Sequence, residues 1–214
     1  MNALFQIVIE RIKESMKFSN APFLGKIFAC MFLWFMLAAC QSLSPTLSPT
    51  LAPAPSAADA AQVDQLLTLI DQRLAVAPMV AKAKWNSGGA INDPPREQLI
   101  LDAVTAQAKG LDEVLVRRFF QAQFDASKAW QLGLHAQWRR QGAGRFDDAP
   151  DLGRDVRPLL DELTPQLIAA LGKIAPLLTQ PGVPAFIEMR SRSLVRGDLD
   201  GVPRRVALQG WLGN

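Results

Sequence analysis

The chain has 214 residues, 49% of them hydrophobic, and a formal net charge of +3. The first forty residues hold four of the basic and two of the acidic side chains, so removing their +2 from +3 leaves +1 for the rest. Such a small, interspersed charge excludes the concentrated basic face of a nucleic-acid-binding protein. Both cysteines, Cys30 and Cys40, lie in these forty residues, and the only histidine is His135. We therefore expect one domain without a disulfide or a metal site.

Residues 1–39 have the layout of an export leader. An apolar run near the end of this leader follows Lys17 and Lys26, and it is short for a membrane-spanning helix. The small residues directly before Cys40 resemble the bacterial lipobox, in which the cysteine is lipidated and becomes the mature amino terminus. We expect a signal peptide, with Met16 as an alternative start, and a lipid anchor on Cys40. A plain signal peptide, or an uncleaved anchor with an incidental cysteine, is the alternative.

Residues 40–58 are predicted to form a tether between the anchor and the domain. They contain Leu-Ser-Pro-Thr twice and Leu-Ala-Pro-Ala-Pro once, a composition that cannot bury a core and favours extended polyproline conformations. In lipobox proteins, a residue such as Gln41 in place of Asp after the cysteine favours the outer membrane. We therefore expect a periplasmic domain that is lipid-anchored to the outer membrane.

Residues 59–214 are predicted to form a single all-α domain of about six helices, because helix formers dominate and period-two runs of β-branched residues are missing. In the first helix, apolar residues recur at steps of three and four and define one buried face; they are Val63, Leu66, Leu67, Ile70, Leu74 and Ala77. Arg73 lies beside this face, and Pro78 is expected to bend the helix. Lys84 follows Arg73 by eleven residues, about three turns, so the two cations project from a similar face.

The next two helices carry further polar residues. The segment from Asn92 to Glu97, with Asp93 before two prolines, is a strong helix-start signal. Another helix is expected to begin near Asp112, and Ser127 and Gln131 interrupt its aromatic stripe. A buried hydroxyl or amide costs about 1–3 kcal/mol if it is left unpaired. We therefore expect both side chains to meet a hydrogen-bonding partner, such as a ligand.

The last third is predicted to contain a loop over residues 142–153 and a fourth helix that opens at Asp155. Arg157 lies in the first turn of this helix, and a cation is unfavourable there unless an anion is held by both the cation and the helix terminus. Prolines from Pro165 onward are expected to divide the remainder into short helices. The Arg-rich segment 190–205 is expected to form a solvated surface.

Eight of these residues have the order and spacing of the active-site residues in the all-α chorismate mutases: Arg73, Lys84, Asp93, Arg96, Glu97, Ser127, Gln131 and Arg157. The Lys84-Trp85 pair and the Arg118-Phe119 pair are similar in particular to the exported, gamma-subclass members, which also carry signal peptides. The resemblance covers about residues 63–165. It implies a chorismate mutase type II fold and the rearrangement of chorismate to prephenate, a branch point of aromatic amino acid biosynthesis after the shikimate pathway, without any cofactor.

The resemblance implies catalytic roles for Lys84, Gln131 and Glu97. Lys84 and Gln131 would donate hydrogen bonds to the ether oxygen of chorismate, and Glu97 would hold its ring hydroxyl. Some exported relatives have Thr and Glu at the positions of Ser127 and Gln131, and some have a disulfide in the last third that this chain lacks.

Substrate-binding roles are implied for Arg73, Asp93, Arg96, Ser127 and Arg157. The two planar guanidinium groups of Arg73 and Arg157 would bind the carboxylates, which lysine could not match with two hydrogen bonds. Ser127 would contact a carboxylate, and the main chain around Asp93 and Arg96 would contribute to the hydroxyl site. The assignment of Arg157 is open because Arg154 lies close by in the sequence.

The competing interpretation is a catalytically inactive, membrane-tethered helical lipoprotein that binds a partner, since Arg and Lys on helices usually reach water. The two interpretations differ in whether Lys84 and Gln131 converge on one ligand between Arg73 and Arg157. The expected partners are chorismate, prephenate and, through Cys40, the membrane. Whether the chain forms a homodimer is left open.

Overall fold

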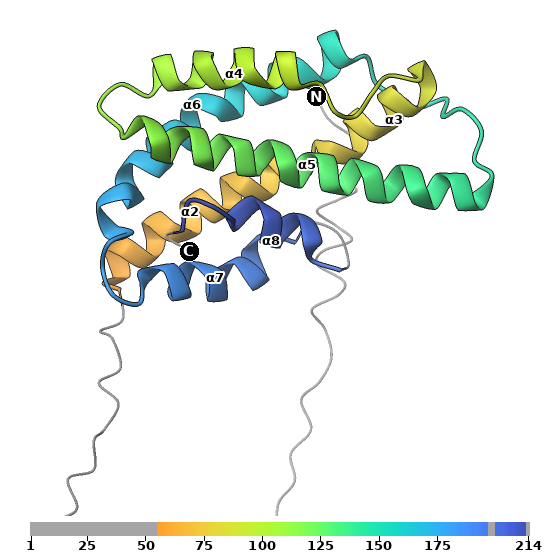
Figure 1. Cartoon of the computed structure of the whole chain (residues 1–214). Helices are drawn as coiled ribbons and strands as arrows, with labels where there is room; N and C mark the ends of the chain where they lie inside the picture. Colours follow the sequence, from red (N-terminus) through yellow and green to blue (C-terminus); the bar gives the residue numbers. More distant parts are fainter. Residues whose placement is uncertain (1–54, 197–199, 213–214) are drawn as a thin grey trace, which may run out of the picture. The chain divides into compact units, whose positions relative to one another are not determined.

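The computed structural model describes residues 55–196 and 200–212, and within these ranges all regular structure is helical (Figure 1). The α-helices are α2 (Ala57–Leu74), α3 (Ala77–Ser87), α4 (Pro94–Gln107), α5 (Glu113–Gln141), α6 (Arg157–Ile174), α7 (Val183–Leu194) and α8 (Val202–Leu208). A π-helical turn (Leu152–Val156) precedes α6, and a 3₁₀ turn (Ala175–Leu177) follows it. The predicted all-α class is therefore confirmed.

Part of the prediction falls outside the described residues. The leader, the anchor residue Cys40 and the tether up to residue 54 all lie there. Within the described ranges, no helix combines the length and the apolar character needed to cross a bilayer.

The first helical segment starts earlier than predicted and is broken rather than bent. Ser56 Oγ accepts a hydrogen bond from the backbone N of Asp59 at 3.1 Å and caps α2, so the end of the predicted tether already belongs to this helix. The sequence predicts one helix bent at Pro78, but α2 ends before Ala75 and α3 begins at Ala77. Pro78 lies in the first turn of α3, where its missing N–H leaves no helical hydrogen bond unmade.

The starts of α4 and α5 agree with the prediction. Asp93 caps α4, with its Oδ1 accepting from the backbone N of Arg96 at 3.3 Å. Asp112 caps α5 in the same way, with Leu115 N as the donor at 2.6 Å. Such caps stabilise a helix by about 1 kcal/mol. They also fix where α4 and α5 begin.

The core lies where α2, α5 and α6 meet. Its large side chains, each at most 1% exposed, include Leu66, Leu67, Ile70, Phe119, Phe120, Leu167, Leu171 and Ile174. Burying one such side chain stabilises the fold by about 1.5–3 kcal/mol. Around this core, α2 packs against α6 and α7, while α5 packs against α3, α4 and α8 (Figure 1).

The prediction that Pro165 breaks a helix is wrong, because Pro165 lies inside α6. A proline leaves the carbonyl four residues earlier, here that of Asp161, without its N–H partner. Both Pro165 and Asp161 are exposed, so water can hydrate this carbonyl. A proline on the outer face of α6 is therefore tolerated.

The Arg-rich segment is less solvated than predicted, because four of its arginines pair with acidic residues, three of them through hydrogen-bonded ion pairs. The hydrogen-bonded pairs are Arg190 Nε with Asp64 Oδ1 at 2.8 Å, Arg196 Nη2 with Asp71 Oδ2 at 3.2 Å, and Arg204 Nη1 with Glu188 Oε1 at 3.0 Å. The side chain of Arg204 is only 13% exposed. Two of the pairs attach the C-terminal part of the domain to α2.

Candidate functional site

One face of α5 collects several of the predicted residues. Ser127, Lys128 and Gln131 follow Phe124 by three, four and seven residues, so the four side chains lie on one side of the helix. Phe124 is 7% exposed and Gln131 is 4% exposed. Because α3 and α4 both pack against α5, side chains from three helices can meet at this face.

Arg73, in the last turn of α2, is a half-buried cation, and no counter-ion pairs with it among the described residues. Its Nε is buried with no hydrogen-bond partner, and within the described ranges no acidic side chain forms an ion pair with it. Its guanidinium carbon lies 5.3 Å from the centre of the Phe124 ring. Burial lowers the pKa of Arg73 to about 10, so the group is still cationic at neutral pH. Such a site favours an anionic ligand.

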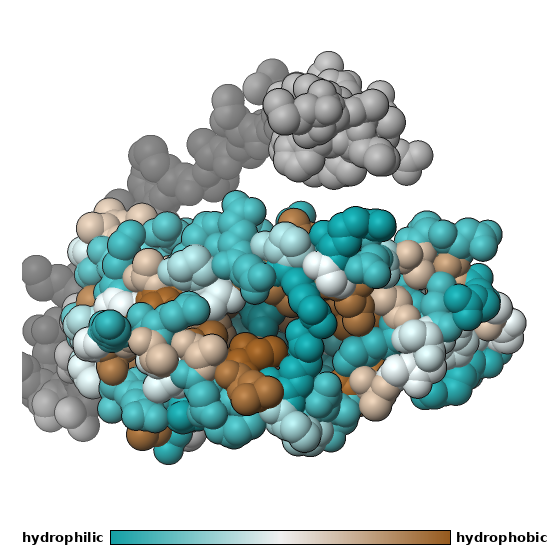
Figure 2. Space-filling model, turned by 90° about the horizontal axis from the view of Figure 1, so that it is seen from above, coloured by the Kyte–Doolittle hydropathy of each residue, from teal (hydrophilic) through white to brown (hydrophobic). Residues whose placement is uncertain are grey.

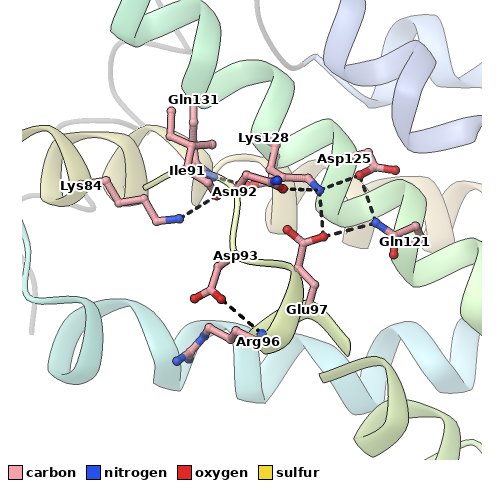
Figure 3. A network of polar contacts seen from close by, with 11 residues as sticks. Lys84, Ile91, Asn92, Asp93, Arg96, Glu97, Gln121, Asp125, Lys128 and Gln131 are labelled. Atoms are coloured by element: carbon pink, nitrogen blue, oxygen red, sulfur yellow. Dashed lines mark hydrogen bonds and ion pairs between the residues drawn. The ribbon is translucent and has the colours of Figure 1, made fainter. Parts of the chain in front are cut away.

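Lys84, in the last turn of α3, lies among charged groups from α4 and α5. Its Nζ donates to the carbonyl of Ile91 at 3.0 Å (Figure 3), which leaves two N–H donors for a ligand. Burial lowers the pKa of Lys84, and the nearby carboxylates of Asp93 and Glu97 partly oppose that shift.

Glu97, in the first turn of α4, is held by α5. Its Oε2 accepts from Lys128 Nζ at 2.8 Å and from Gln121 Nε2 at 3.4 Å. Lys128 also pairs with Asp125 Oδ1 at 2.9 Å (Figure 3). Lys128, Gln121 and Asp125 were not predicted from the sequence to belong to the site. The available signal was the position of Lys128 between Ser127 and Gln131 on the same face.

Ser127 and Gln131 meet each other, as their burial required. Gln131 Nε2 donates to Ser127 Oγ at 3.0 Å, which uses one of the two amide N–H groups. Within the described residues, the buried side-chain polar atoms that lack a partner are Arg73 Nε, Gln123 Oε1 and Gln131 Oε1. Two of these three atoms belong to predicted site residues, so polar groups at the site remain available to a ligand.

Asp93 and Arg96 form the start of α4 next to this cluster. Both side chains are exposed, and Asp93 accepts the backbone N–H of Arg96 as described above. The charges of both residues act on Lys84, Asp93 raising its pKa and Arg96 lowering it. The structure therefore brings Lys84, Asp93, Arg96 and Glu97 together.

Arg157 is less closely connected to the cluster. It is the first residue of α6 and is exposed, and within the described part of the chain no hydrogen bond or ion pair joins it to another predicted residue. The neighbouring Arg154 is paired with Asp155, with Nε–Oδ1 and Nη2–Oδ2 distances of 2.8 and 3.0 Å. Of the two arginines that the sequence left open, Arg157 is the one without an acidic partner among the described residues.

A separate groove of about 450 Å³ runs between α4 and α6. Its lining includes Leu99, Ile100 and Thr164, and Arg96 is the one predicted site residue among its lining residues. Leu99 is 71% exposed, and Figure 2 shows apolar side chains gathered around a hollow on this face. The groove therefore meets the cluster around Lys84 at Arg96, while its other lining residues lie outside the predicted site.

Comparisons with known proteins agree with this arrangement. Residues 61–132 match the chorismate mutase type II family, and this range contains every predicted site residue except Arg157. A secreted chorismate mutase from Mycolicibacterium smegmatis is 35% identical over 128 residues, which cover 59% of this chain and 70% of that protein. A secreted chorismate mutase from Mycobacterium tuberculosis is 29% identical over 175 residues, or 79% of this chain and 87% of that protein.

The solved structures show the same relationship. The crystal structure of chorismate mutase from Burkholderia thailandensis is 40% identical and superimposes with a TM-score of 0.61. The match covers 69% of this chain and 94% of that structure. The family match, the sequence identities and the shared fold together show that the chain belongs to the chorismate mutase type II family.

Proposed function

We propose that the cluster around Lys84 is the active site at which this chorismate mutase rearranges chorismate to prephenate. The observation that carries the assignment is the guanidinium of Arg73, whose Nε is buried without a hydrogen-bond partner, which has no anionic partner among the described residues and which lies over the ring of Phe124 on α5. A protein that keeps a buried cation unpaired gains stability when an anion binds there. Chorismate, with two carboxylates, supplies such an anion.

The reaction suits a site made of fixed donors. The rearrangement is unimolecular and needs no proton transfer, and negative charge develops on the ether oxygen as its bond breaks. Catalysis then requires that the substrate be held in a chair-like conformation and that the developing charge be stabilised. Both tasks can be performed by positioned cations and amides, without any cofactor.

Lys84 and Gln131 are assigned to the ether oxygen. The ammonium of Lys84 has donors left beyond its bond to Ile91, and the amide of Gln131 keeps one N–H beyond its bond to Ser127. A hydrogen bond from a charged donor contributes about 1.5–3 kcal/mol, and one from a neutral amide contributes less. We therefore expect Lys84 to be the larger contributor.

The remaining residues are assigned to substrate binding and orientation. Arg73 and Arg157 bind the two carboxylates, and Ser127 contacts one of them. Glu97 accepts a hydrogen bond from the ring hydroxyl, supported by the main chain at Asp93 and Arg96. Support for Glu97 in this role comes from its 18% exposure and its position in the first turn of α4 beside Lys84.

The test is the loss of chorismate absorbance with purified full-length protein, beside the Lys84→Ala variant as a control for contaminating mutase. Conversion that collapses in the variant supports both the activity and the assignment of Lys84. Folded wild-type protein that binds chorismate without converting it would leave the tethered binding protein as the better account.

The proposal extends to export. Two relatives are named secreted chorismate mutases, and this agrees with the leader-like residues 1–39. We assign Cys40 as the lipidated residue that anchors the domain at the periplasmic face of the outer membrane, with residues 41–55 as the tether that precedes α2. This assignment rests on the residue pattern around Cys40.

Membrane anchoring can be tested by labelling cells with a fatty-acid analogue and separating the inner and outer membranes. The wild-type chain should carry the label and sediment with the outer membrane, whereas Cys40→Ser should lose both properties. An unlabelled protein in the soluble periplasmic fraction would leave a plain signal peptide as the explanation.

A further inference from the structure

Lys128 connects two helices at the candidate site. Its Nζ lies 2.8 Å from Glu97 Oε2 and 2.9 Å from Asp125 Oδ1, so one ammonium joins α5 to the first turn of α4 (Figure 3). The side chains of Lys128 and Glu97 are only 20% and 18% exposed. The ion pair is therefore partly shielded from water, where such pairs are stronger than on an open surface.

The contacts of Glu97 are one-sided. Lys128 and Gln121 both donate to Oε2, and no hydrogen bond from a described residue reaches Oε1 (Figure 3). Lys128 thus selects the rotamer in which one carboxylate oxygen is occupied and the other is available. A carboxylate held in this way can accept a hydrogen bond in a fixed direction.

The charge of Lys128 also matters for an anionic substrate. A lone carboxylate close to a dianion would repel it, whereas a carboxylate paired with an ammonium forms a nearly neutral unit. Burial disfavours the ammonium form of Lys128, but its hydrogen bonds to Glu97 and Asp125 outweigh burial and raise its pKa. The ammonium of Lys128 therefore stays charged at neutral pH.

We propose that Lys128 is a positioning residue that holds the carboxylate of Glu97 toward the ring hydroxyl of the substrate and neutralises its charge beside the substrate carboxylates. This inference rests on the proposed function of Glu97. The role proposed for Lys128 differs from the roles proposed for its neighbours on α5. Ser127 and Gln131 are assigned to direct contacts with the substrate, whereas Lys128 acts through Glu97.

The alternative is that the Lys128–Glu97 ion pair only holds α4 against α5. A second ion pair between the same two helices provides a control for this alternative. Arg117 also joins α5 to α4, with its Nη2 2.8 Å from Asp102 Oδ1, and it contacts none of the predicted site residues through a hydrogen bond in the described ranges. Arg117→Met removes an ion pair between the same two helices in the second half of α4, together with a pair to Glu113 on α5 itself. Its effect measures what loss of a helix-to-helix clamp does by itself.

The experiment compares steady-state kinetics and thermal unfolding of the full chain and the variants Lys128→Met, Lys128→Arg, Glu97→Gln, the Lys128→Met/Glu97→Gln double variant and Arg117→Met. If Lys128 acts through Glu97, Lys128→Met raises KM about tenfold and lowers kcat less, because ground-state and transition-state binding weaken together. The double variant should then resemble Glu97→Gln alone. Lys128→Arg should recover most of the lost affinity, and Arg117→Met should leave KM within about twofold of wild type.

Two outcomes would overturn the proposal. If the effects of Lys128→Met and Glu97→Gln multiply in the double variant, Lys128 does not act through Glu97. If Lys128→Met matches Arg117→Met in kinetics and unfolding temperature, the ion pair is only a clamp. A folded wild-type chain without mutase activity would instead refute the proposed function, so the two failures are distinguishable.

Discussion

The guanidinium carbon of Arg73 lies 5.3 Å from the centre of the Phe124 ring, while the Arg73 Nε is buried without a hydrogen-bond partner. The aromatic ring offsets only part of the cost of removing this cation from water, by about 0.5–2 kcal/mol. In the unliganded protein Arg73 is therefore a source of instability that binding of an anion relieves.

The lowered pKa of Arg73 also indicates that its positive charge destabilises the folded protein. Burial lowers this pKa from the ordinary arginine value, which the unfolded chain keeps, to about 10 in the folded protein. Between these two values the unfolded chain binds more protons, so the free energy of unfolding rises with pH there. Below about pH 10 the full cost of the buried charge is present, and neutral pH lies in that range.

We predict that Arg73→Met raises the free energy of unfolding of the unliganded protein by about 1–3 kcal/mol and lowers kcat/KM more than about a hundredfold. Chemical denaturation without ligand and steady-state kinetics measure the two quantities. Arg190→Met is the matched control, because Arg190 is paired with Asp64 and its loss should destabilise the protein. A destabilised Arg73→Met protein would contradict the view of Arg73 as an unpaired buried cation.

Loss of Lys84 should affect the chemical step more than binding. We expect Lys84→Ala to lower kcat by about 10²–10³-fold, the cost of removing one donor to a developing oxyanion. Substrate affinity should change less, because in the proposed site Arg73 and Arg157, rather than Lys84, bind the carboxylates. Single-turnover rates and equilibrium binding separate the two effects. An unchanged single-turnover rate would remove Lys84 from the chemistry.

Features that depend on a few adjacent residues were predictable from the sequence. Asp93 and Asp112 are local caps, and both start the helices where they were expected. The break between α2 and α3 was predicted only as a bend, because proline at position 78 is compatible either with a kink or with the first turn of a new helix.

Long-range pairing was not predictable in the same way. Lys128 and Glu97 are 31 residues apart, and Arg190 and Asp64 are 126 residues apart. Each of these side chains alone matches a solvated residue on a helix surface, and only the packing of the helices brings the partners together. Resemblance to a family identified the residues assigned to the substrate, but it did not identify the ion pair that supports one of them.

The amide of Gln131 predicts a flat pH profile. Glutamine donates a hydrogen bond at any ordinary pH, whereas a carboxyl group at this position donates only when it is protonated. We expect wild-type kcat/KM to stay nearly constant from mildly acidic to mildly basic pH. In Gln131→Glu, kcat/KM should fall as the pH rises through the pKa of the new carboxyl group, which burial raises.

The control for this pH profile is Lys84, whose ammonium must also be protonated. Burial lowers its pKa below the ordinary lysine value, so wild-type activity should decline as the solution becomes strongly basic. That decline should appear in both proteins, while the loss at lower pH should appear only in Gln131→Glu. A steep wild-type loss just above neutrality would count against Gln131 as the donor to the ether oxygen.

Arg157 and Arg154 provide a final test of the site, because they differ in pairing. Arg154 is bound to Asp155 and its side chain is 79% exposed, so Arg154→Ala should leave kcat/KM within about twofold of wild type. Arg157 has no acidic partner within the described ranges and lies in the first turn of α6. Loss of one charged hydrogen bond to a carboxylate should lower kcat/KM about 10–100-fold in Arg157→Ala.

Because both side chains are exposed, neither variant should unfold at a clearly lower temperature. The reverse result, with Arg154→Ala impaired and Arg157→Ala normal, would transfer the second carboxylate site to Arg154 and require the Arg154–Asp155 pair to open when substrate binds.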